Sequence, residues 1–543
     1  MPRRPHERLT DLVLGARALA ATGLLRPMRP DTLARASLAV VRDGLSPAAA
    51  YGMAAALYPR QLALVDDRGT MTFAETSRQI TALASALAAA GVSRGDRVGL
   101  MCRNHRGFVL TAAALSSVAA DVVLLSVEAT APEIEAVSAS QRLGLVVHDD
   151  EFGTRFPEGQ GPRRLVPHRE EAEGTTESLD DIEGTSGRRL RIARFPGSHF
   201  TLLSSGTTGA PRATARAVPL SVDPLATLVA RVPLQVRDVT LIASPLFHAW
   251  GFGNLGLAMV FSSTVVLQRR FDPEATLAAV AHHRVRVLAA VPVMLQRLTE
   301  LPERTCRRYD LSSLEVVAAS GSAMPGDLAN RFMDRFGDVL YNVYGSTEAG
   351  WASIATPSDL RTDPRTAGRP GHASAMTILD PTGRPCPTGE VGRIVVDNAL
   401  TRVPGTDPPP DVPGGAVATG DLGHFDGSGL LFVDGRQDDM IVSGGENVYP
   451  QEVENILSLH PAVLEATVTG VPDDQFGQRL RALVVLREGQ SVTEAGVKEF
   501  VRARLARYKV PRDVVFVDEL PRTASGKQLH RETGDSPGRA EQR

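Results

Sequence analysis

The sequence predicts an α/β protein with a large N-terminal domain, built from several units of mostly parallel sheet flanked by helices, and a small α+β domain at its C-terminus. Three observations support this prediction. The chain has 543 residues, which is too long for a single hydrophobic core. From residue 60, short Val- and Leu-rich runs alternate with Ala-rich amphipathic segments, as in β-α-β units around a parallel sheet. Near Gly435 this alternation gives way to a compact α+β pattern.

The predicted strands are short apolar runs bounded by turn-forming residues. They span residues 62–65, 69–73, 97–101, 121–125, 200–203, 239–243, 264–267, 285–291 and 314–318, with a strand of a smaller β region at 389–396. Amphipathic helices are predicted between them, for example at residues 74–90 and 273–282. Acidic stretches in residues 149–196 predict a solvated insertion, and the Pro- and Gly-rich residues 399–417 predict a loop.

The first 25 residues combine basic and apolar character. Asp11 and Arg17 interrupt the apolar run of residues 9–25, which argues against a secretory signal, and no run elsewhere predicts a membrane-spanning helix. A helix over this region would have one apolar side, formed by Leu9, Leu12, Val13, Ala16, Leu19 and Ala20. This side predicts either a helix packed on the main domain or a peripheral contact with a membrane.

The composition excludes several classes of function. A net charge of −3 provides no basic field for nucleic acid. The three cysteines lack metal-ligand or disulfide spacing, which indicates a reducing compartment and predicts a cytoplasmic location, either free or peripheral at the inner membrane face. Only three of the 59 basic residues are lysines, so a lysine inside a motif is informative; they are Lys498, Lys509 and Lys527.

Residues 204–209 have the composition of a polyphosphate-binding loop. Their glycines allow backbone N–H groups to turn toward an anion, and their small hydroxyls add donors without crowding it. The loop follows a predicted strand but lacks the GxxxxGK[ST] spacing of a Walker A motif, which argues against a Walker-type kinase or motor. A flexible surface turn is the alternative. The candidate residues are Ser204, Ser205, Gly206, Thr207, Thr208 and Gly209.

Four further motifs follow the loop in order: Tyr344-Gly345-Ser346-Thr347-Glu348, Thr419-Gly420-Asp421, Gly435-Arg436-Gln437-Asp438-Asp439 and Pro521-Arg522-Thr523-Ala524-Ser525-Gly526-Lys527. With the loop, they resemble the adenylate-forming superfamily of acyl-CoA synthetases, adenylation domains and luciferases. The region Arg103-Asn104-His105-Arg106-Gly107-Phe108 looks most like bacterial fatty-acyl-CoA ligases. The Gly-Tyr element that the superfamily usually carries within residues 399–417 is missing, so the resemblance is weakest there.

The resemblance implies a division of the chain into domains. Residues 1–50 would form a helical extension, and residues 51–434 the large domain with the ATP site and the acyl pocket. Residues 435–531 would form the small mobile domain, followed by a disordered tail at 532–543.

The resemblance also implies ATP and Mg²⁺ as cofactors. Arg212 stands where the superfamily usually has the lysine of the phosphate loop, and it keeps that charge. Thr347 and Glu348 would contact phosphate and Mg²⁺, because a hard cation that bridges phosphates takes one or two carboxylate ligands. The adenosine moiety would lie against Gly321, Ser322, Ala323, Tyr344 and Gly345, with ribose or phosphate contacts from Asp421 and Arg436.

His248 resembles the residue that borders the acyl pocket of this superfamily. It would lie near the substrate carboxylate, although a lone histidine after an apolar run is often structural. The candidate pocket walls carry no charge, which favours an apolar acid over an amino acid, whose ammonium group would need a buried acidic partner. These walls are Ala249, Trp250, Gly251, Val291, Val293 and Met294.

Asp438 stands at the position of the superfamily's hinge, where the small domain turns between two poses. In the adenylating pose Lys527 would face the active site. In the thiol-transferring pose the residues facing it would be Ser443, Gly444, Gly445 and Glu446.

The sequence thus predicts an AMP-forming acid–thiol ligase. A medium- to long-chain fatty acid would react with ATP to give acyl-AMP and pyrophosphate, and then with CoA to give a thioester. A carrier protein or an amine are alternative acceptors. A protein that binds adenylates without turnover is an alternative of another class, against which the presence of Glu348 and Lys527 argues. The sequence leaves a homodimer open.

Overall fold

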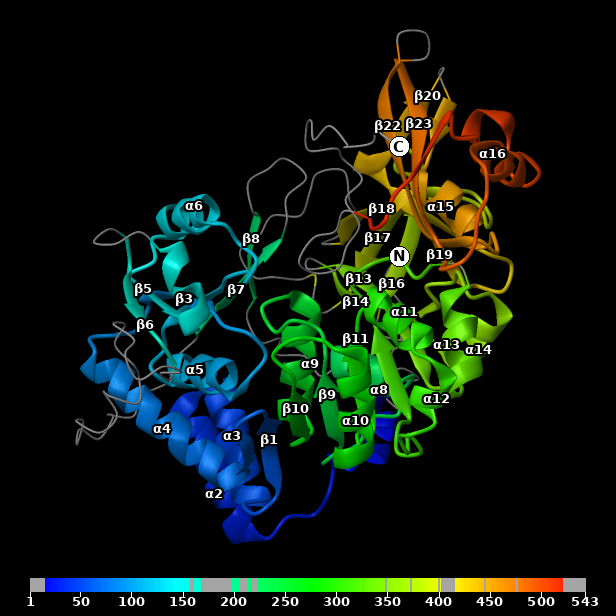
Figure 1. Cartoon of the computed structure of the whole chain (residues 1–543). Coiled ribbons are helices and arrows are strands. Elements are labelled where there is room, and N and C mark those ends of the chain that lie inside the picture. The colour runs from blue at the N-terminus through cyan, green and yellow to red at the C-terminus, as the bar shows by residue number, and fades with distance from the viewer. Residues whose placement is uncertain are drawn as a thin grey trace.

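The computed structural model describes residues 15–156, 161–167, 198–204, 212–216, 223–325, 327–346, 349–371, 374–398, 401, 416–443, 446–473 and 477–520. Within these ranges the strands form four sheets. Figure 1 shows the six-stranded sheet (residues 97–216) on the left, the nine-stranded sheet with its helices in the centre, and the C-terminal sheet above it.

The largest sheet has nine strands in the order β15-β14-β13-β12-β11-β9-β10-β1-β2. The strands from β13 to β1 are parallel to their neighbours, and antiparallel strands close both edges. Strands β10, β11 and β12 are buried along their whole length, as expected where helices cover both faces. The strands are β1 (Leu62–Asp66), β2 (Gly69–Thr72), β9 (Val239–Ile242), β10 (Thr264–Leu267), β11 (Val287–Ala290), β12 (Val316–Ala319), β13 (Leu340–Ser346), β14 (Gly350–Ala355) and β15 (Arg369–Pro370).

The second sheet has six strands in the order β6-β5-β3-β4-β7-β8. All neighbours are parallel except β7 and β8, which form an antiparallel pair. Its strands are β3 (Arg97–Met101), β4 (Asp121–Leu124), β5 (Leu145–His148), β6 (Arg163–Leu165), β7 (Phe200–Ser204) and β8 (Arg212–Arg216).

Helices pack on these sheets and share buried cores with them. One core joins both sheets through residues of α3, α4, α5 and α9, and a second lies beside α10, α11 and α13. The helices are α2 (Pro30–Asp43), α3 (Pro47–Leu57), α4 (Phe73–Ala89), α5 (Arg106–Ser117), α6 (Ala131–Gln141), α8 (Asp223–Val229), α9 (Ala249–Val260), α10 (Pro273–His283), α11 (Pro292–Glu300), α12 (Glu303–Cys306), α13 (Leu328–Phe336), α14 (Pro357–Thr362), α15 (Pro450–Ser458) and α16 (Glu494–Arg502).

The chain changes sheets near the predicted position. Strands β16 (Ala375–Leu379), β17 (Gly392–Asp397), β18 (Val417–Phe425) and β19 (Leu431–Arg436) form an antiparallel sheet. The 3-10 turn η3 (Gln437–Asp439) leads from it to the C-terminal sheet, which has its own buried core. That sheet contains β20 (Ile441–Ser443), β21 (Glu446–Val448), β22 (Val463–Asp473), β23 (Gly477–Leu486) and β24 (Asp513–Phe516). The predicted α/β fold with a smaller C-terminal α+β part is therefore confirmed.

The predicted insertion at residues 149–196 is only partly correct. The 3-10 helix η1 (Asp150–Arg155) and strand β6 continue the fold, with Phe152 and Leu165 fully buried. The sequence pattern did not indicate these elements, because the stretch is short and acidic residues follow it. Residues 168–197 lie outside the described ranges, as does most of the predicted loop at 399–417. Among the described helices, none is both long enough and apolar enough to cross a membrane.

Candidate active site

Four of the predicted site residues lie at or after the carboxyl ends of neighbouring parallel strands, in the spatial order β13-β12-β11-β9. His248 follows β9, Val291 follows β11, Gly321 follows β12, and Tyr344 lies near the end of β13. Ligands of open α/β sheets bind at this edge, because the loops that leave parallel strands converge there. The topology therefore brings together residues that are up to about 100 positions apart in the chain.

His248 is the N-cap residue of α9 and is half-buried, with most of its imidazole enclosed. Burial lowers the pKa of His248 to about 4, so the ring is neutral at pH 7. Its Nε2 is inaccessible to solvent and has no hydrogen-bond partner among the residues that the structure describes. Because an unsatisfied buried polar atom costs free energy, this nitrogen is well suited to a ligand oxygen.

The predicted pocket walls divide into two groups. Trp250 is half-buried, and its Nε1 donates a hydrogen bond to the Ala290 carbonyl oxygen at 2.9 Å, which links α9 to the end of β11. Ala249 is exposed and Val293 is half-buried, so both leave side-chain surface for a ligand. Val291 and Met294 instead belong to the buried core beside α11 and support the others from behind.

Gly251 does not provide a wall that a larger side chain could fill. A Cβ atom at this buried position would lie 2.1 Å from the Pro245 carbonyl oxygen and 2.9 Å from that of Ser244. The missing side chain thus points at the backbone that leads to His248. The absence of a side chain at Gly251 therefore allows α9 to approach this segment closely.

A second group of predicted residues joins β13 to β18 and β19. The Tyr344 hydroxyl donates to Asp421 Oδ2 at 2.6 Å and lies 3.1 Å from Thr419 Oγ1. Burial, together with the neighbouring Asp421 charge, raises the pKa of Tyr344 well above its usual range, so the phenol stays protonated as a donor. Arg436 pairs with Asp421 in the β18–β19 register.

The Arg436 guanidinium completes this group. Its Nε lies 3.6 Å from Asp421 Oδ1, is buried, and makes no hydrogen bond within the described part of the chain. A phenol, a carboxylate and a guanidinium where β13 meets the four-stranded sheet supply the donors and acceptors that ribose hydroxyls and phosphate oxygens require. The residues present therefore fit a nucleotide.

The segment after β12 is open to solvent. Gly321 has φ +95°, a left-handed conformation that favours glycine, and a Cβ there would meet only Val291 Cγ1 at 3.4 Å. Gly321 and Ala323 are exposed and Ser322 is half-buried. Gly345 is also exposed at the end of β13. Gly321, Ser322 and Ala323 leave the edge accessible to a flat ring. A Cβ at Gly345 would instead lie 1.9 Å from the Gly350 carbonyl oxygen, so this glycine allows β13 and β14 to approach closely.

The two ends of the predicted phosphate loop are paired. Ser204 is the last residue of β7 and is the backbone partner of Arg212, the first residue of β8. The loop therefore starts at the carboxyl edge of the second sheet. Asp438 lies in η3 and Ser443 in β20, and the backbone of Glu446 pairs with that of Ser443. Predicted residues outside the described ranges are Ser205, Gly206, Thr207, Thr208, Gly209, Thr347, Glu348, Gly444, Gly445 and Lys527.

Asn104 is a residue that the sequence prediction did not place in the site. It is buried just after β3, and its Nδ2 donates to the carbonyl oxygens of Ile242 at 3.3 Å and Ser244 at 2.9 Å. Its Oδ1 accepts a hydrogen bond from Leu246 N at 2.8 Å. One amide thus satisfies three backbone groups of the segment that ends at His248, and it holds this segment against the second sheet. A buried amide leaves no periodic signal in a sequence.

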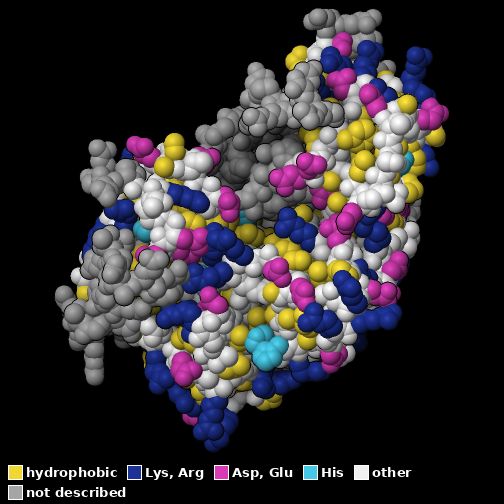
Figure 2. Space-filling model, viewed as in Figure 1, with side chains coloured by type: hydrophobic (Ala, Val, Ile, Leu, Met, Phe, Trp, Pro, Cys, Tyr) yellow, Lys and Arg dark blue, Asp and Glu magenta, His cyan; other side chains and the backbone are white. Residues whose placement is uncertain are grey.

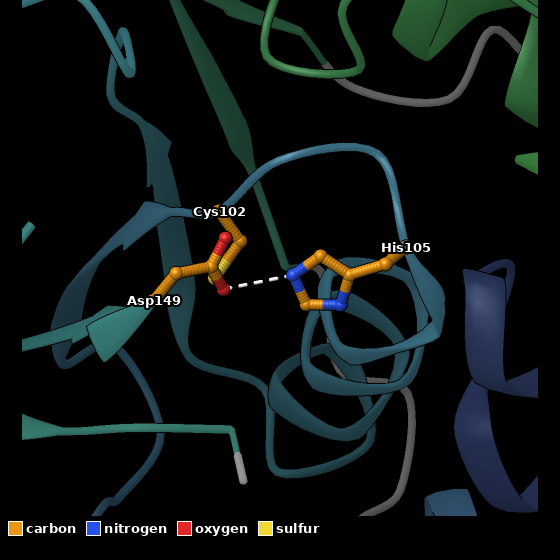
Figure 3. A group of neighbouring side chains, drawn as sticks. All are labelled: Cys102, His105 and Asp149. Atoms are coloured by element: carbon orange, nitrogen blue, oxygen red, sulfur yellow. Dashed lines mark hydrogen bonds and ion pairs between the residues drawn. The ribbon is translucent and has the colours of Figure 1, made fainter. Parts of the chain in front are cut away.

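A buried cluster beside Asn104 has the composition of a metal site. Figure 3 shows Cys102, His105 and Asp149 pointing toward one another. His105 Nδ1 accepts a hydrogen bond from Gly107 N at 3.0 Å, so Nε2 carries the proton that is shared with Asp149 Oδ1 at 2.8 Å. Both ring nitrogens are therefore engaged, and burial raises the pKa of the Cys102 thiol well above its usual range. These hydrogen bonds hold the loop that carries Asn104, and they leave neither nitrogen of His105 free for a metal.

Comparison with known proteins identifies the class to which this fold and site belong. The family model for AMP-binding enzymes matches residues 53–401, and the model for the C-terminal domain of these enzymes matches residues 452–527. The chain belongs to the AMP-binding enzyme family, and the predicted membership of the adenylate-forming superfamily is confirmed.

Three similar proteins illustrate the family. A feruloyl-CoA synthase from Amycolatopsis is 33% identical over 88% of this chain and 96% of the relative. A 2-succinylbenzoate–CoA ligase from Geobacillus kaustophilus is 34% identical over 88% of this chain and 95% of the relative. The structure of the amide bond synthetase McbA from Marinactinospora thermotolerans matches with a TM-score of 0.76 and 27% identity, covering 88% of this chain and 98% of that one.

These matches confirm the predicted enzyme class, an AMP-forming acyl-CoA synthetase that uses ATP, Mg²⁺ and CoA.

Proposed function

We propose that this protein activates an apolar, ring-bearing carboxylic acid with ATP and transfers the acyl group to CoA. In the first half-reaction a carboxylate oxygen attacks the α-phosphorus, the bond from this phosphorus to the bridging oxygen breaks, and pyrophosphate leaves. In the second, the CoA sulfur attacks the acyl carbon, the bond to the AMP oxygen breaks, and the thiol proton goes to solvent. The chain's contribution is to position the reactants and to stabilise charge.

The observation that carries this proposal is the enclosed, neutral imidazole of His248 with its unpartnered Nε2. In the tautomer with a proton on Nε2, the ring donates a hydrogen bond to a carboxylate oxygen without adding a competing charge. Ala249, Trp250 and Val293 flank the start of α9 and α11 and are uncharged. A carboxylate held at one end of an apolar surface is the arrangement that an apolar acid requires.

The ring-bearing character is supported by the names of the relatives. The feruloyl-CoA synthase and the 2-succinylbenzoate–CoA ligase are named for aromatic acids. The half-buried indole of Trp250, two residues after His248, offers an aromatic face at the start of α9. The medium- to long-chain fatty acid expected from the sequence is the alternative substrate.

On the nucleotide side, Tyr344, Asp421 and Arg436 would hold the ribose and an adjacent phosphate oxygen. Arg212 at the end of the phosphate loop, Thr347 and Glu348 at the phosphates and Mg²⁺, and Lys527 from the small domain complete the proposed machinery. When bound, Mg²⁺ would neutralise phosphate charge.

An amine is the alternative acceptor, and the similarity to the amide bond synthetase favours its inclusion. A carrier-protein thiol is a further alternative. Both share the first half-reaction with CoA, so the acceptor needs a separate measurement.

The test is pyrophosphate release from ATP with a panel of acids that includes cinnamic, benzoic and indolyl acids and fatty acids of increasing length. The proposal expects release with ring-bearing acids, and thioester by mass analysis when CoA is added. His248→Ala should raise KM for the acid with little change in KM for ATP. Preference for fatty acids would contradict the substrate class. Amide formation with added amines, but no thioester with CoA, would contradict the acceptor.

A further inference from the structure

We propose that helix α2 and the segment before it dock this protein on the surface of an anionic lipid bilayer. Neither the adenylating site nor the family matches account for this face. The family model begins at residue 53, after α2.

The outer side of α2 is an exposed apolar stripe. Ala34, Leu38 and Val41 follow one another at spacings of four and three residues, which places them on one side of α2. Leu45 comes directly after Gly44, which ends the helix. Leu38 is 60% exposed, Val41 is 56% exposed and Leu45 is 58% exposed. Three more large apolar side chains extend the surface before and along the helix, namely Leu25, Met28 and Leu33, which are 65%, 45% and 49% exposed. Exposed apolar side chains gathered in this way mark an interaction site.

The same segment is basic in a protein that is acidic overall. Residues 1–45 contain eight arginines and four acidic residues, a net charge of +4, whereas the whole chain carries −3. Arg26, Arg29 and Arg35 are exposed beside the apolar stripe. Figure 2 shows Lys and Arg side chains gathered at the end of the molecule where α2 lies in Figure 1. Apolar side chains bordered by arginines are typical of helices that lie in the interface of anionic membranes.

The stripe is presented by a rigid element. The inner side of α2 packs on α3 through the buried Ala36 and Ala39, and the added Cβ of Gly52 would lie 2.9 Å from Ala39 Cβ. The buried Asp43 accepts a hydrogen bond from Ser117 of α5 at 2.8 Å and pairs with Arg42. The exposed apolar side chains therefore belong to the outer side of a helix whose inner side is already packed against the domain.

A lipid surface fits this face better than a second copy of the chain. A symmetric dimer through α2 would bring two segments of net positive charge together, which opposes association. Anionic lipid headgroups complement that charge, and the apolar side chains can enter the region below them. In Figure 1, α2 lies at the end of the molecule opposite the C-terminal sheet, so docking leaves the small domain clear of the bilayer.

The test is sedimentation of the full chain with vesicles of phosphatidylcholine alone or with one third phosphatidylglycerol. The wild type should partition at least about tenfold more strongly onto the anionic vesicles, and added salt should weaken binding. The triple variant Leu38→Gln/Val41→Gln/Leu45→Gln should bind at least about tenfold more weakly. A matched control, Val260→Gln/Val391→Gln/Leu459→Gln, replaces apolar side chains that are 49%, 44% and 46% exposed elsewhere and should bind like the wild type.

Unchanged melting temperatures would show that all variants are folded. Equal partitioning of the wild type and the α2 variant would overturn the proposal, as would absence of binding to anionic vesicles. If the α2 variant instead converts a dimer to a monomer in light scattering without changing vesicle binding, a second copy covers this face and the proposal is wrong.

Discussion

The enclosed imidazole of His248 should make the free energy of unfolding depend on pH. Burial lowers its pKa from 6.5 to about 4, so the unfolded chain binds a proton at this site more readily than the folded one. Acidification therefore favours unfolding. The loss of folding free energy caused by His248 is absent above pH 6.5, grows as the pH falls below this value, and reaches its limit near pH 4. Replacing His248 by glutamine, which stays neutral, should remove this part of the pH dependence.

The size of the effect follows from the two pKa values. At pH 7.5 both states hold a neutral ring and the difference is close to zero. At pH 5.0 the unfolded state is almost fully protonated at this site and the folded state only about one tenth, which favours unfolding by about 2 kcal/mol. The wild type should therefore lose about 2 kcal/mol more than His248→Gln between these pH values. Other titrating groups contribute equally to both proteins and cancel.

Urea unfolding at pH 7.5 and 5.0, followed by the fluorescence of the two tryptophans, measures this difference. His424 provides a control of opposite sign. Its Nδ1 lies 2.7 Å from Asp434 Oδ2, and the hydrogen bond to this carboxylate raises the pKa of His424. Its contribution to stability is present at low pH and is lost as the pH rises, so His424→Gln should increase the loss on acidification. A difference below about 0.5 kcal/mol for His248→Gln would show that the imidazole is not desolvated, and would remove the basis for its neutral role.

Three further predictions concern turnover. Asn104→Ala leaves three buried backbone groups near His248 without their partner. Pyrophosphate release should therefore fall roughly 10- to 100-fold, through kcat and KM for the acid, while KM for ATP stays unchanged. Parallel changes in both KM values would indicate general damage to the fold. Tyr344→Phe keeps the ring but loses a 2.6 Å bond to a carboxylate, worth about 1.5–3 kcal/mol, and should raise KM for ATP at least about tenfold; unchanged ATP kinetics would separate Tyr344 from the nucleotide. Lys527→Ala should abolish pyrophosphate release yet still convert synthetic acyl-adenylate and CoA to thioester, and loss of both half-reactions would refute the two-pose mechanism.

Most of the parallel strands in the two large sheets were predictable, because these strands are buried on both faces and are uninterrupted apolar runs. The predicted ranges 97–101 and 264–267 coincide with β3 and β10. The predicted range 285–291 is longer than β11 because it includes Val285, which is buried but lies outside the strand. Its backbone closes the end of α10 by bonding to Val280, and its side chain is fully buried in the core. Burial outside a strand cannot be told from burial inside it by composition alone.

The candidate site was predictable to the extent that its residues follow strands. His248, Tyr344, Asp421 and Arg436 stand in recognisable motifs, and the structure joins the last three by direct contacts. The role of Asn104 was not predictable, since its partners lie about 140 residues away in sequence. The sequence also could not show that a side chain at Gly251 would point at the backbone, because this depends on how closely α9 approaches Pro245.

The few lysines of the chain lie in its C-terminal part, where the two described ones share one kind of contact. All three lysines follow residue 497, and 56 of the 59 basic residues are arginines. Lys509 Nζ lies 2.7 and 2.6 Å from the two carboxylate oxygens of Glu452, at the start of α15. Lys498 Nζ contacts Glu494 at 2.6 Å and the Arg512 carbonyl oxygen.

At both described lysines a compact ammonium group meets two oxygens at short range, a geometry that the broad planar guanidinium reproduces poorly. If lysine is kept only where such a cation is needed, Lys527 should obey the same constraint, because its proposed role is to contact the acid and the α-phosphate together. Lys527→Arg should then leave pyrophosphate release nearly as low as Lys527→Ala. Arg212→Lys should be close to neutral, because a cation at the phosphate loop needs charge more than shape. Full activity of Lys527→Arg would mean that the surviving lysines reflect chance and not geometry.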